Sequence, residues 1–195
     1  MPELPEVETV CRGLHQALEG ATIKSVTLNR PDLRIPFPRG FTKKLEGVRI
    51  AGISRRAKYL LWQLDSGDVM LAHLGMSGCF IVNDGSENVG KHDHVVMKLA
   101  DGRSVIYRDP RRFGLMTLVD KGALAGHELL AHLGPEPLEK TFTVEYLQSA
   151  LARRTGSIKA ALMDQEVVVG VGNIYASEAL FLTGIHPLAK ARDVS

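Results

Sequence analysis

The 195-residue sequence has few cysteines, no long apolar run and little net charge. Its two cysteines, Cys11 and Cys79, are too few for a four-ligand zinc site, and we expect both thiols to be reduced and buried. The apolar runs are too short to cross a membrane, and the acidic N-terminus is not a signal peptide. These absences indicate a globular cytoplasmic protein with neither a disulfide framework nor a membrane partner.

Basic residues are clustered although the formal net charge is only +2. The clusters occupy residues 55–58, 91–94, 108–112 and 153–159. If the fold brings them together they form a basic face for nucleic acid. The alternative is four ordinary solvated patches, and the sequence leaves both possibilities open.

The N-terminus, Pro2-Glu3-Leu4-Pro5-Glu6, carries the most specific chemistry in the chain. If Met1 is removed, Pro2 becomes a secondary amine with a reference pKa of about 8, far below that of lysine. Such an amine can attack an electrophilic carbon and form an iminium. Glu3 and Glu6 would supply acid and base groups. The simpler reading is a proline and two glutamates that open a helix.

Apolar periodicity predicts an α+β protein in two parts. Residues 3–19 have helical spacing, and residues 21–119 contain short apolar runs separated by turn signals such as Ser66-Gly67 and Asp101-Gly102. We therefore expect an N-terminal antiparallel β-sandwich that carries the first helix. The expected strands are 48–54, 58–64, 69–74, 79–82, 94–99, 104–107 and 114–119, with a loop at 83–91.

The segment 133–142 contains Gly134, Pro135 and Pro137 and predicts a domain boundary, with one domain at 1–134 and a second at 135–195. Beyond it, helices are expected at 144–153, 157–163 and 173–182. Gly170-Val171-Gly172 predicts a tight turn before the last helix, whose free N–H groups suit a phosphate. A plain helix–helix turn is the alternative.

Met76, Arg111 and Phe113 lie in two predicted turns, His73–Gly78 and Asp109–Gly114. Side chains of this kind are costly to expose without a purpose. A protein that extracts a base from duplex DNA needs an apolar wedge and a group that bonds the orphaned partner base. The alternative is that Met76 and Phe113 are core residues.

Taken together, these motifs closely resemble the bacterial formamidopyrimidine-DNA glycosylase family. They occur in order along nearly the whole chain. The matching segments are Pro2–Thr9 (PELPEVET), Arg55–Leu61 (RRAKYLL), His73–Gly78 (HLGMSG), Lys91–His94 (KHDH), Asp109–Gly114 (DPRRFG), His132–Pro137 (HLGPEP), Leu162–Asp164 (LMD) and Val168–Glu178 (VVGVGNIYASE).

The resemblance implies a β-sandwich followed by a helical domain with a helix–two-turn–helix motif. It also implies base-excision repair of oxidised purines, 8-oxoguanine and formamidopyrimidines, by a bifunctional glycosylase and abasic-site lyase. The reaction would proceed by base flipping, an N-terminal proline Schiff base, and β- and δ-elimination. The expected partner is damaged double-stranded DNA, bound by a monomer associated with the bacterial nucleoid in the cytoplasm.

Roles are carried over from the family residue by residue. Pro2 matches the nucleophile and Glu3 the general acid/base, with Glu6 grouped beside them. Lys58 matches a lysine that contacts phosphate near the lesion and assists elimination. The remaining assignments are the void-filling triad Met76, Arg111 and Phe113, with Arg111 facing the estranged cytosine; the DNA-backbone contacts His92, Arg154 and Asn173; and the residues bordering the base pocket, Tyr175 and Glu178.

The match departs from the family in one respect. Full-length members carry a C-terminal four-cysteine zinc finger, whereas this chain ends at Ser195 and has no zinc ligands for it, so we expect a truncated chain. The resemblance implies no cofactor and no metal for catalysis. Two alternatives stay open, a non-catalytic DNA-damage-binding fragment and the sister glycosylase family for oxidised pyrimidines.

Overall fold

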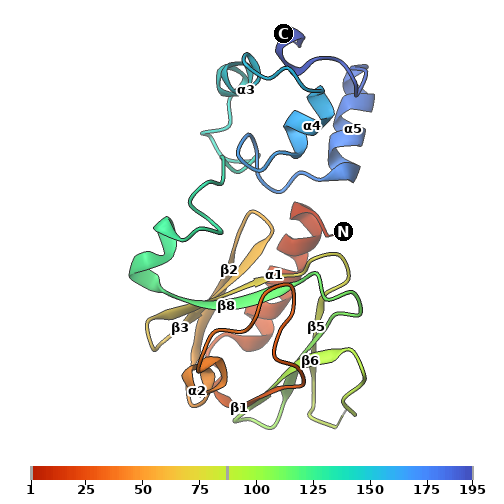
Figure 1. Cartoon of the computed structure of the whole chain (residues 1–195). Coiled ribbons are helices and arrows are strands. Elements are labelled where there is room, and N and C mark those ends of the chain that lie inside the picture. The colour runs from red at the N-terminus through yellow and green to blue at the C-terminus, as the bar shows by residue number, and fades with distance from the viewer. Residues whose placement is uncertain (1, 87, 195) are drawn as a thin grey trace. The chain divides into compact units, whose positions relative to one another are not determined.

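The computed structural model describes residues 2–86 and 88–194. The chain forms two compact units, one ending at Ala125 and the other beginning at Gly126 (Figure 1). The predicted boundary at 134/135 lies inside the second unit.

The chain begins with α1 (Leu4–Leu18), close to the helix predicted at 3–19. Its apolar stripe packs into the core of the first unit, as expected for residues that repeat with the 3.6-residue period of a helix. The buried residues of the stripe are Val7, Cys11, Leu14 and Leu18. Glu3 is the N-cap, and Gly20 at φ 82° turns the chain away after the helix ends.

Two four-stranded antiparallel sheets form the first unit, which confirms the predicted β-sandwich. One sheet has the order β2-β3-β4-β8 and the other β1-β6-β7-β5. The largest fully buried side chains include Trp62, Phe41 and Tyr107. The strands are β1 (Ile23–Leu28), β2 (Ile50–Arg56), β3 (Tyr59–Leu64), β4 (Asp68–His73), β5 (Cys79–Asn83), β6 (Asp93–Leu99), β7 (Ser104–Arg108) and β8 (Leu115–Asp120).

Seven of these strands match predicted ones within two residues or so, but β1 and the short helix α2 (Phe41–Leu45) were not predicted. In β1, polar residues interrupt a run of only six, and α2 has five residues. Both segments are too short for a periodicity to emerge. The structure supports them by tertiary contacts instead, since β1 pairs with β6 and Phe41 is buried.

The second unit is helical and contains α3 (Val144–Leu151), α4 (Ile158–Met163) and α5 (Asn173–Thr183), as predicted. Thr143 and Ser157 cap α3 and α4 by accepting hydrogen bonds from backbone N–H groups three residues later. A small core joins these helices, made of Leu151, Ile158, Ala161, Leu180 and Ala191. Two 3₁₀ turns, η1 (Lys121–Gly126) and η2 (Ala191–Asp193), complete the elements.

The two cysteines differ. Cys11 is buried, as expected, but Cys79 at the start of β5 is exposed, so the prediction of two buried thiols is wrong for Cys79. Cys79 is the first residue of β5, which is an edge strand of its sheet, so neighbouring strands cover its side chain only in part. In the described part of the chain, no helix has the length and hydropathy needed to span a membrane.

Candidate active site and nucleic-acid interface

One end of the β2-β3-β4-β8 sheet collects several expected site segments. In the ladder, Arg56 pairs with Tyr59, Tyr59 with His73, and His73 with Leu115. The segment carrying Lys58, the loop carrying Met76 and the loop carrying Phe113 all join this row. Segments far apart in sequence therefore meet because register, not sequence distance, sets their position.

The N-terminal residues are held by a capping box on α1. The Glu3 N–H donates to Glu6 Oε2 at 2.9 Å, while the Glu3 carboxylate receives the Glu6 N–H. Glu3 is only 2% exposed, whereas Glu6 is exposed and Pro2 half-buried. Glu6 therefore orients Glu3. Met1, whose removal the proposed chemistry needs, lies outside the described residues.

Lys58 lies in the two-residue turn between β2 and β3 and is only 7% exposed. Burial lowers the pKa of its ammonium group, and the negative charge of Glu3 partly opposes that shift. An interaction of Glu3 with Lys58 thus brings the N-terminus of α1 and the β2–β3 turn to one place. Perturbed, buried ionisable groups of this kind are typical of catalytic sites.

His73 at the end of β4 is a third titratable group in this region. Its ring lies 5.0 Å from that of Tyr59, and its Nδ1 accepts the Gly75 N–H at 2.9 Å. Burial, with help from Arg34 and Lys58, lowers the pKa of His73 to about 4. His73 is therefore neutral at physiological pH and orients the start of the Met76 loop.

A buried carboxylate joins the two loops expected to carry the void-filling residues. Asp109 accepts hydrogen bonds from Ser77 Oγ at 2.6 Å and from the Gly114 N–H at 2.9 Å. Ser77 Oγ in turn accepts the Arg111 N–H at 3.1 Å. Asp109 is fully buried. The loops 74–78 and 109–114 therefore form one hydrogen-bonded platform.

Two glycines allow these loops to lie this close to each other. A Cβ on Gly75 would lie 2.3 Å from the Phe113 carbonyl carbon, and φ at Gly75 is +62°. A Cβ on Gly114 would lie 1.7 Å from the Tyr107 hydroxyl. Neither position has room for a larger residue, so the glycines are required by close approach.

The platform exposes the residues predicted for the triad. Met76 is 40% and Phe113 46% exposed, which rules out the alternative that they are core residues. The Arg111 guanidinium carbon lies 4.8 Å from the Phe113 ring centroid, within cation–π range. Exposed apolar side chains on a rigid base suit insertion into a partner.

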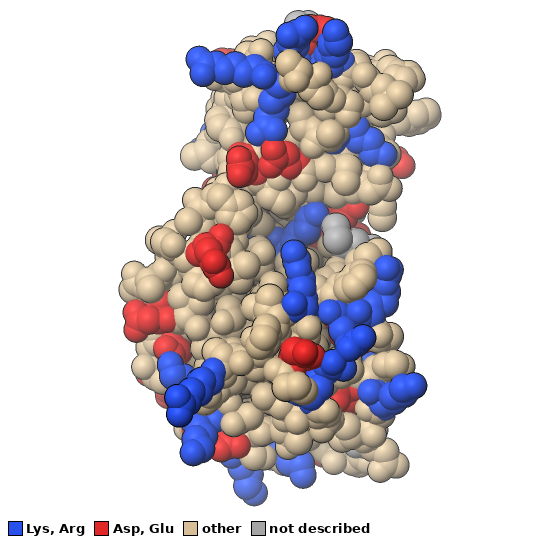
Figure 2. Space-filling model, in the orientation of Figure 1, with Lys and Arg blue, Asp and Glu red and all other residues tan. Residues whose placement is uncertain are grey.

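Three of the four basic clusters lie at this end of the first unit. Residues 55–58 are at the β2–β3 turn, residues 91–94 are at the start of β6, and residues 108–112 are at the end of β7. His92 is exposed, and its carbonyl accepts the Asp109 N–H at 3.0 Å. However, His94 is buried and Arg108 is paired with buried Asp93. Figure 2 shows Lys and Arg side chains gathered over the β5–β6 side of this unit. Within the first unit, only part of these three clusters is therefore exposed and able to form a basic face.

In the second unit, Arg154 is partly exposed and its Nη1 donates to Asp164 Oδ2 at 2.5 Å. Asn173 is exposed at the first turn of α5. The preceding turn is fastened by one amide side chain, since Gln165 Oε1 accepts the Gly170 N–H and Gln165 Nε2 donates to the Val171 carbonyl. The Gly170 φ of +81° confirms the tight turn predicted there.

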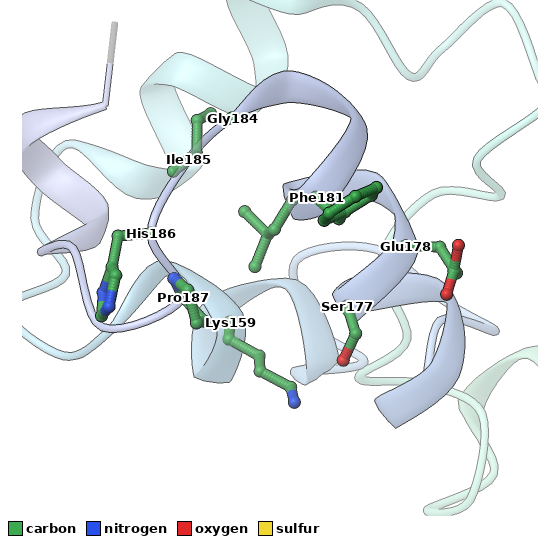
Figure 3. A pocket seen from close by; sticks show the side chains of 9 residues that line it. Lys159, Ser177, Glu178, Phe181, Gly184, Ile185, His186 and Pro187 are labelled. Carbon is green, nitrogen blue, oxygen red and sulfur yellow. The ribbon is translucent and has the colours of Figure 1, made fainter.

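Tyr175 and Glu178 lie on α5, and both are exposed. Glu178 also lines a groove between α4, α5 and the segment after α5 (Figure 3). Lys159 and Ser177 extend toward the same side of that groove, and Phe181 forms part of its wall. Tyr175, the other residue predicted to border the damaged base, is not among the residues that line this groove.

Sequence reasoning missed the residues that support the site, chiefly Ser77, Asp109, His73 and the pair Glu8–Arg55. All five lie inside the quoted motifs, but only the fold reveals their partners. Cys11 and Cys79 do not fit a zinc site, because Cys11 is directed at the Ile53 carbonyl in the core and two thiols cannot complete a ligand set. Among the described residues there is no group of three or more metal-ligating side chains.

Family models cover most of the chain. The formamidopyrimidine-DNA glycosylase N-terminal domain matches residues 1–116, and the formamidopyrimidine-DNA glycosylase H2TH domain matches residues 133–195. The same division into a sandwich and a helical part is seen in the structure.

Similar proteins agree with this assignment. The formamidopyrimidine-DNA glycosylase of Azorhizobium caulinodans is 52% identical over 96% of this chain and 68% of its own length. That of Rhodospirillum rubrum is 50% identical over 100% and 70%. The Lactococcus lactis enzyme bound to N7-benzyl-Fapy-dG DNA has a TM-score of 0.92 and 35% identity over 100% of this chain and 72% of its own. A Lactococcus lactis complex with oxidised-pyrimidine DNA has a TM-score of 0.93 and 36% identity over 100% and 73%. The chain belongs to the formamidopyrimidine-DNA glycosylase family.

Proposed function

We propose that this protein removes oxidised purines, 8-oxoguanine and formamidopyrimidines, from duplex DNA and cleaves the strand at the resulting abasic site. The observation that carries this proposal is the buried pair Glu3 and Lys58, held beside Pro2 at the N-terminus of α1. Burying two ionisable groups lowers the free energy of unfolding, so such groups are typical of sites where they act in a reaction. Proton transfer by Glu3 and assistance to strand cleavage by Lys58 are actions that suit these two groups.

The first step is base release. After removal of Met1, the Pro2 nitrogen attacks C1′ of the damaged nucleotide, and the bond from C1′ to the base breaks. The departing base takes the electron pair of that bond and the proton that the Pro2 nitrogen loses. Glu3 protonates the sugar ring oxygen as the ring opens, which leaves an iminium between Pro2 and C1′.

Strand cleavage then follows from the same intermediate. The iminium acidifies the hydrogen on C2′, so a base can remove it while the bond from C3′ to its phosphate oxygen breaks. A second elimination removes the hydrogen on C4′ and breaks the bond from C5′ to its phosphate oxygen. Hydrolysis of the iminium by water then releases the sugar remnant and restores the Pro2 amine. Lys58 assists by contacting a phosphate near the lesion. None of these steps transfers an electron, so we propose that no cofactor takes part.

The exposed platform supplies the base-flipping part of the proposal. Met76 and Phe113 would fill the space left by the flipped nucleotide, and Arg111 would bond the estranged cytosine. His92, Arg154 and Asn173 would contact the DNA backbone, while Tyr175 and Glu178 would border the damaged base. The proposed partner is damaged double-stranded DNA, bound by one copy of the chain near the nucleoid.

The test is borohydride trapping on a duplex with 8-oxoguanine opposite cytosine. An undamaged duplex and a Pro2→Gly variant serve as controls, and mass spectrometry of the same sample establishes whether Met1 is present. We expect an adduct that needs the lesion and is lost or weakened in the variant. A wild-type chain without Met1 that binds the lesion but forms no adduct would instead be a damage-binding protein.

The substrate class needs a second comparison, because a Lactococcus lactis relative has been crystallised with DNA containing an oxidised pyrimidine. Excision of 8-oxoguanine should be compared with excision of thymine glycol, each opposite its normal partner. Faster release of 8-oxoguanine is expected. Faster release of thymine glycol would favour the sister activity.

A further inference from the structure

Arg55 on β2 bonds to two different parts of the first unit. Its Nε donates to Glu8 Oε2 on α1 at 2.8 Å, and its Nη1 donates to the Ala57 carbonyl at 2.9 Å. Only 14% of the Arg55 side chain is exposed. A partly buried guanidinium with two fixed acceptors is well ordered, because its planar fork sets the directions of both bonds.

The acceptor at Ala57 is an unusual place in the chain. Ala57 is buried and has a φ of +52°, a left-handed conformation that a non-glycine residue adopts at a cost of roughly 1–2 kcal/mol. Its carbonyl belongs to the peptide bond that leads to Lys58. A hydrogen bond to that carbonyl therefore fixes the plane from which the Lys58 side chain starts.

We propose that Arg55 is a positioning residue that ties the Ala57–Lys58 turn to α1 through Glu8. Because α1 also carries Glu3, the clamp Glu8–Arg55–Ala57 sets the placement of Lys58 relative to the N-terminal site. This inference rests on the proposed function, in which Lys58 assists strand cleavage. Displacement by about 1 Å can cost up to a hundredfold in rate at such a site.

Arg12 provides a matched control. Its Nε donates to the other Glu8 oxygen, Oε1, at the same 2.8 Å distance. Its side chain is 79% exposed, and its ion pair joins two residues of α1 one turn apart. Loss of Arg12 therefore removes an equal charge from Glu8 but leaves the bond to Ala57 in place.

The experiment compares Arg55→Gln, Arg55→Lys and Arg12→Gln with the wild-type chain. The single-turnover rate of strand cleavage is measured on a duplex with a preformed abasic site, at saturating DNA and across DNA concentrations. We expect Arg55→Gln to lower the saturating rate about tenfold, with half-saturation changed by less than about twofold. Arg55→Lys should recover only part of the rate, because one ammonium cannot replace the fork, and Arg12→Gln should match wild type.

Thermal unfolding shows whether each variant is folded, and Glu8→Ala, which removes the acceptor for Arg55 Nε, breaks the same clamp from α1 if Arg55→Gln is unfolded. A folded Arg55→Gln or Glu8→Ala chain that cleaves at the wild-type rate would overturn the positioning role. Equal losses in Arg12→Gln and Arg55→Gln would also overturn it, because the charge on Glu8 would then be the cause. A wild-type chain that neither traps nor cleaves would instead refute the proposed function, and the role of Arg55 with it.

Discussion

The polar residues predicted for the reaction in the first unit differ in solvent exposure from those predicted for DNA-backbone contacts in the second. In the first unit, Glu3 and Lys58 are withdrawn from water and fixed by a capping box and a strained turn. In the second unit, Arg154 and Asn173 remain at least partly exposed. The proposed roles account for this difference. Groups that take part in the reaction, as proposed for Glu3 and Lys58, gain from a dry, preorganised setting, whereas a contact to the DNA backbone away from the reaction needs only an accessible charge or donor.

The largest expected effect comes from removing the buried carboxylate. Glu3→Gln keeps the shape of the N-cap but removes the group that protonates the sugar ring oxygen, so we expect base excision to fall by about a hundredfold or more. Single-turnover release of 8-oxoguanine measures it. Because an amide can still cap the helix, the free energy of unfolding should change by no more than about 1 kcal/mol. A rate within threefold of wild type would show that Glu3 is buried for structural reasons only.

A second prediction concerns pH and tests whether burial extends to the end of β4. The pKa of His73 is about 4 in the folded protein, below the ordinary value of about 6.5. Between these values the unfolded chain binds a proton that the folded chain does not. Stability is therefore lost as the pH falls through this window, by roughly 2 kcal/mol. Urea unfolding at pH 7 and pH 4.5 measures how much free energy of unfolding is lost on acidification. The loss should be smaller in His73→Gln than in wild type, and equal losses would contradict the prediction.

A smaller effect is expected at the platform that carries the exposed residues. Ser77→Ala removes both the donor to Asp109 and the acceptor for the Arg111 N–H. The loops should then hold Met76 and Arg111 less firmly, and excision from a normal duplex should fall about tenfold. A lesion placed in single-stranded DNA needs no wedge, so its excision should be unchanged relative to wild type. An equal loss on both substrates would mean that Ser77 supports the catalytic residues instead.

The smallest effect is expected in the second unit. Arg154→Gln should weaken DNA binding a few-fold, because Asp164 already neutralises part of the charge. The salt dependence of log affinity should become shallower by up to about one unit. The neighbouring Arg153→Gln, also exposed, provides the comparison. If Arg153 changes the slope as much as Arg154, the contact is diffuse and not specific to Arg154.

Much of the fold could be predicted from periodicity, but the supporting contacts of the site could not. The stripe of Val7, Cys11 and Leu14 identifies α1, and turn glycines separate most strands. By contrast, Asp109 and Ser77 are 32 residues apart, and Glu8 and Arg55 are 47 apart. Nothing in either local sequence indicates its partner. Glu6 is predicted as an acid/base group from its residue type, and the fold adds that its carboxylate accepts the Glu3 N–H.

The pairing of Tyr59 with His73 and of His73 with Leu115 has a consequence for the order of folding events. The first pair closes within a hairpin, but the second joins strands about 40 residues apart, which is slow because a long loop must close first. A chain that has not paired β4 with β8 has no platform for Met76 and Phe113. A partly folded chain would therefore also lack the surface on which the proposed base flipping depends.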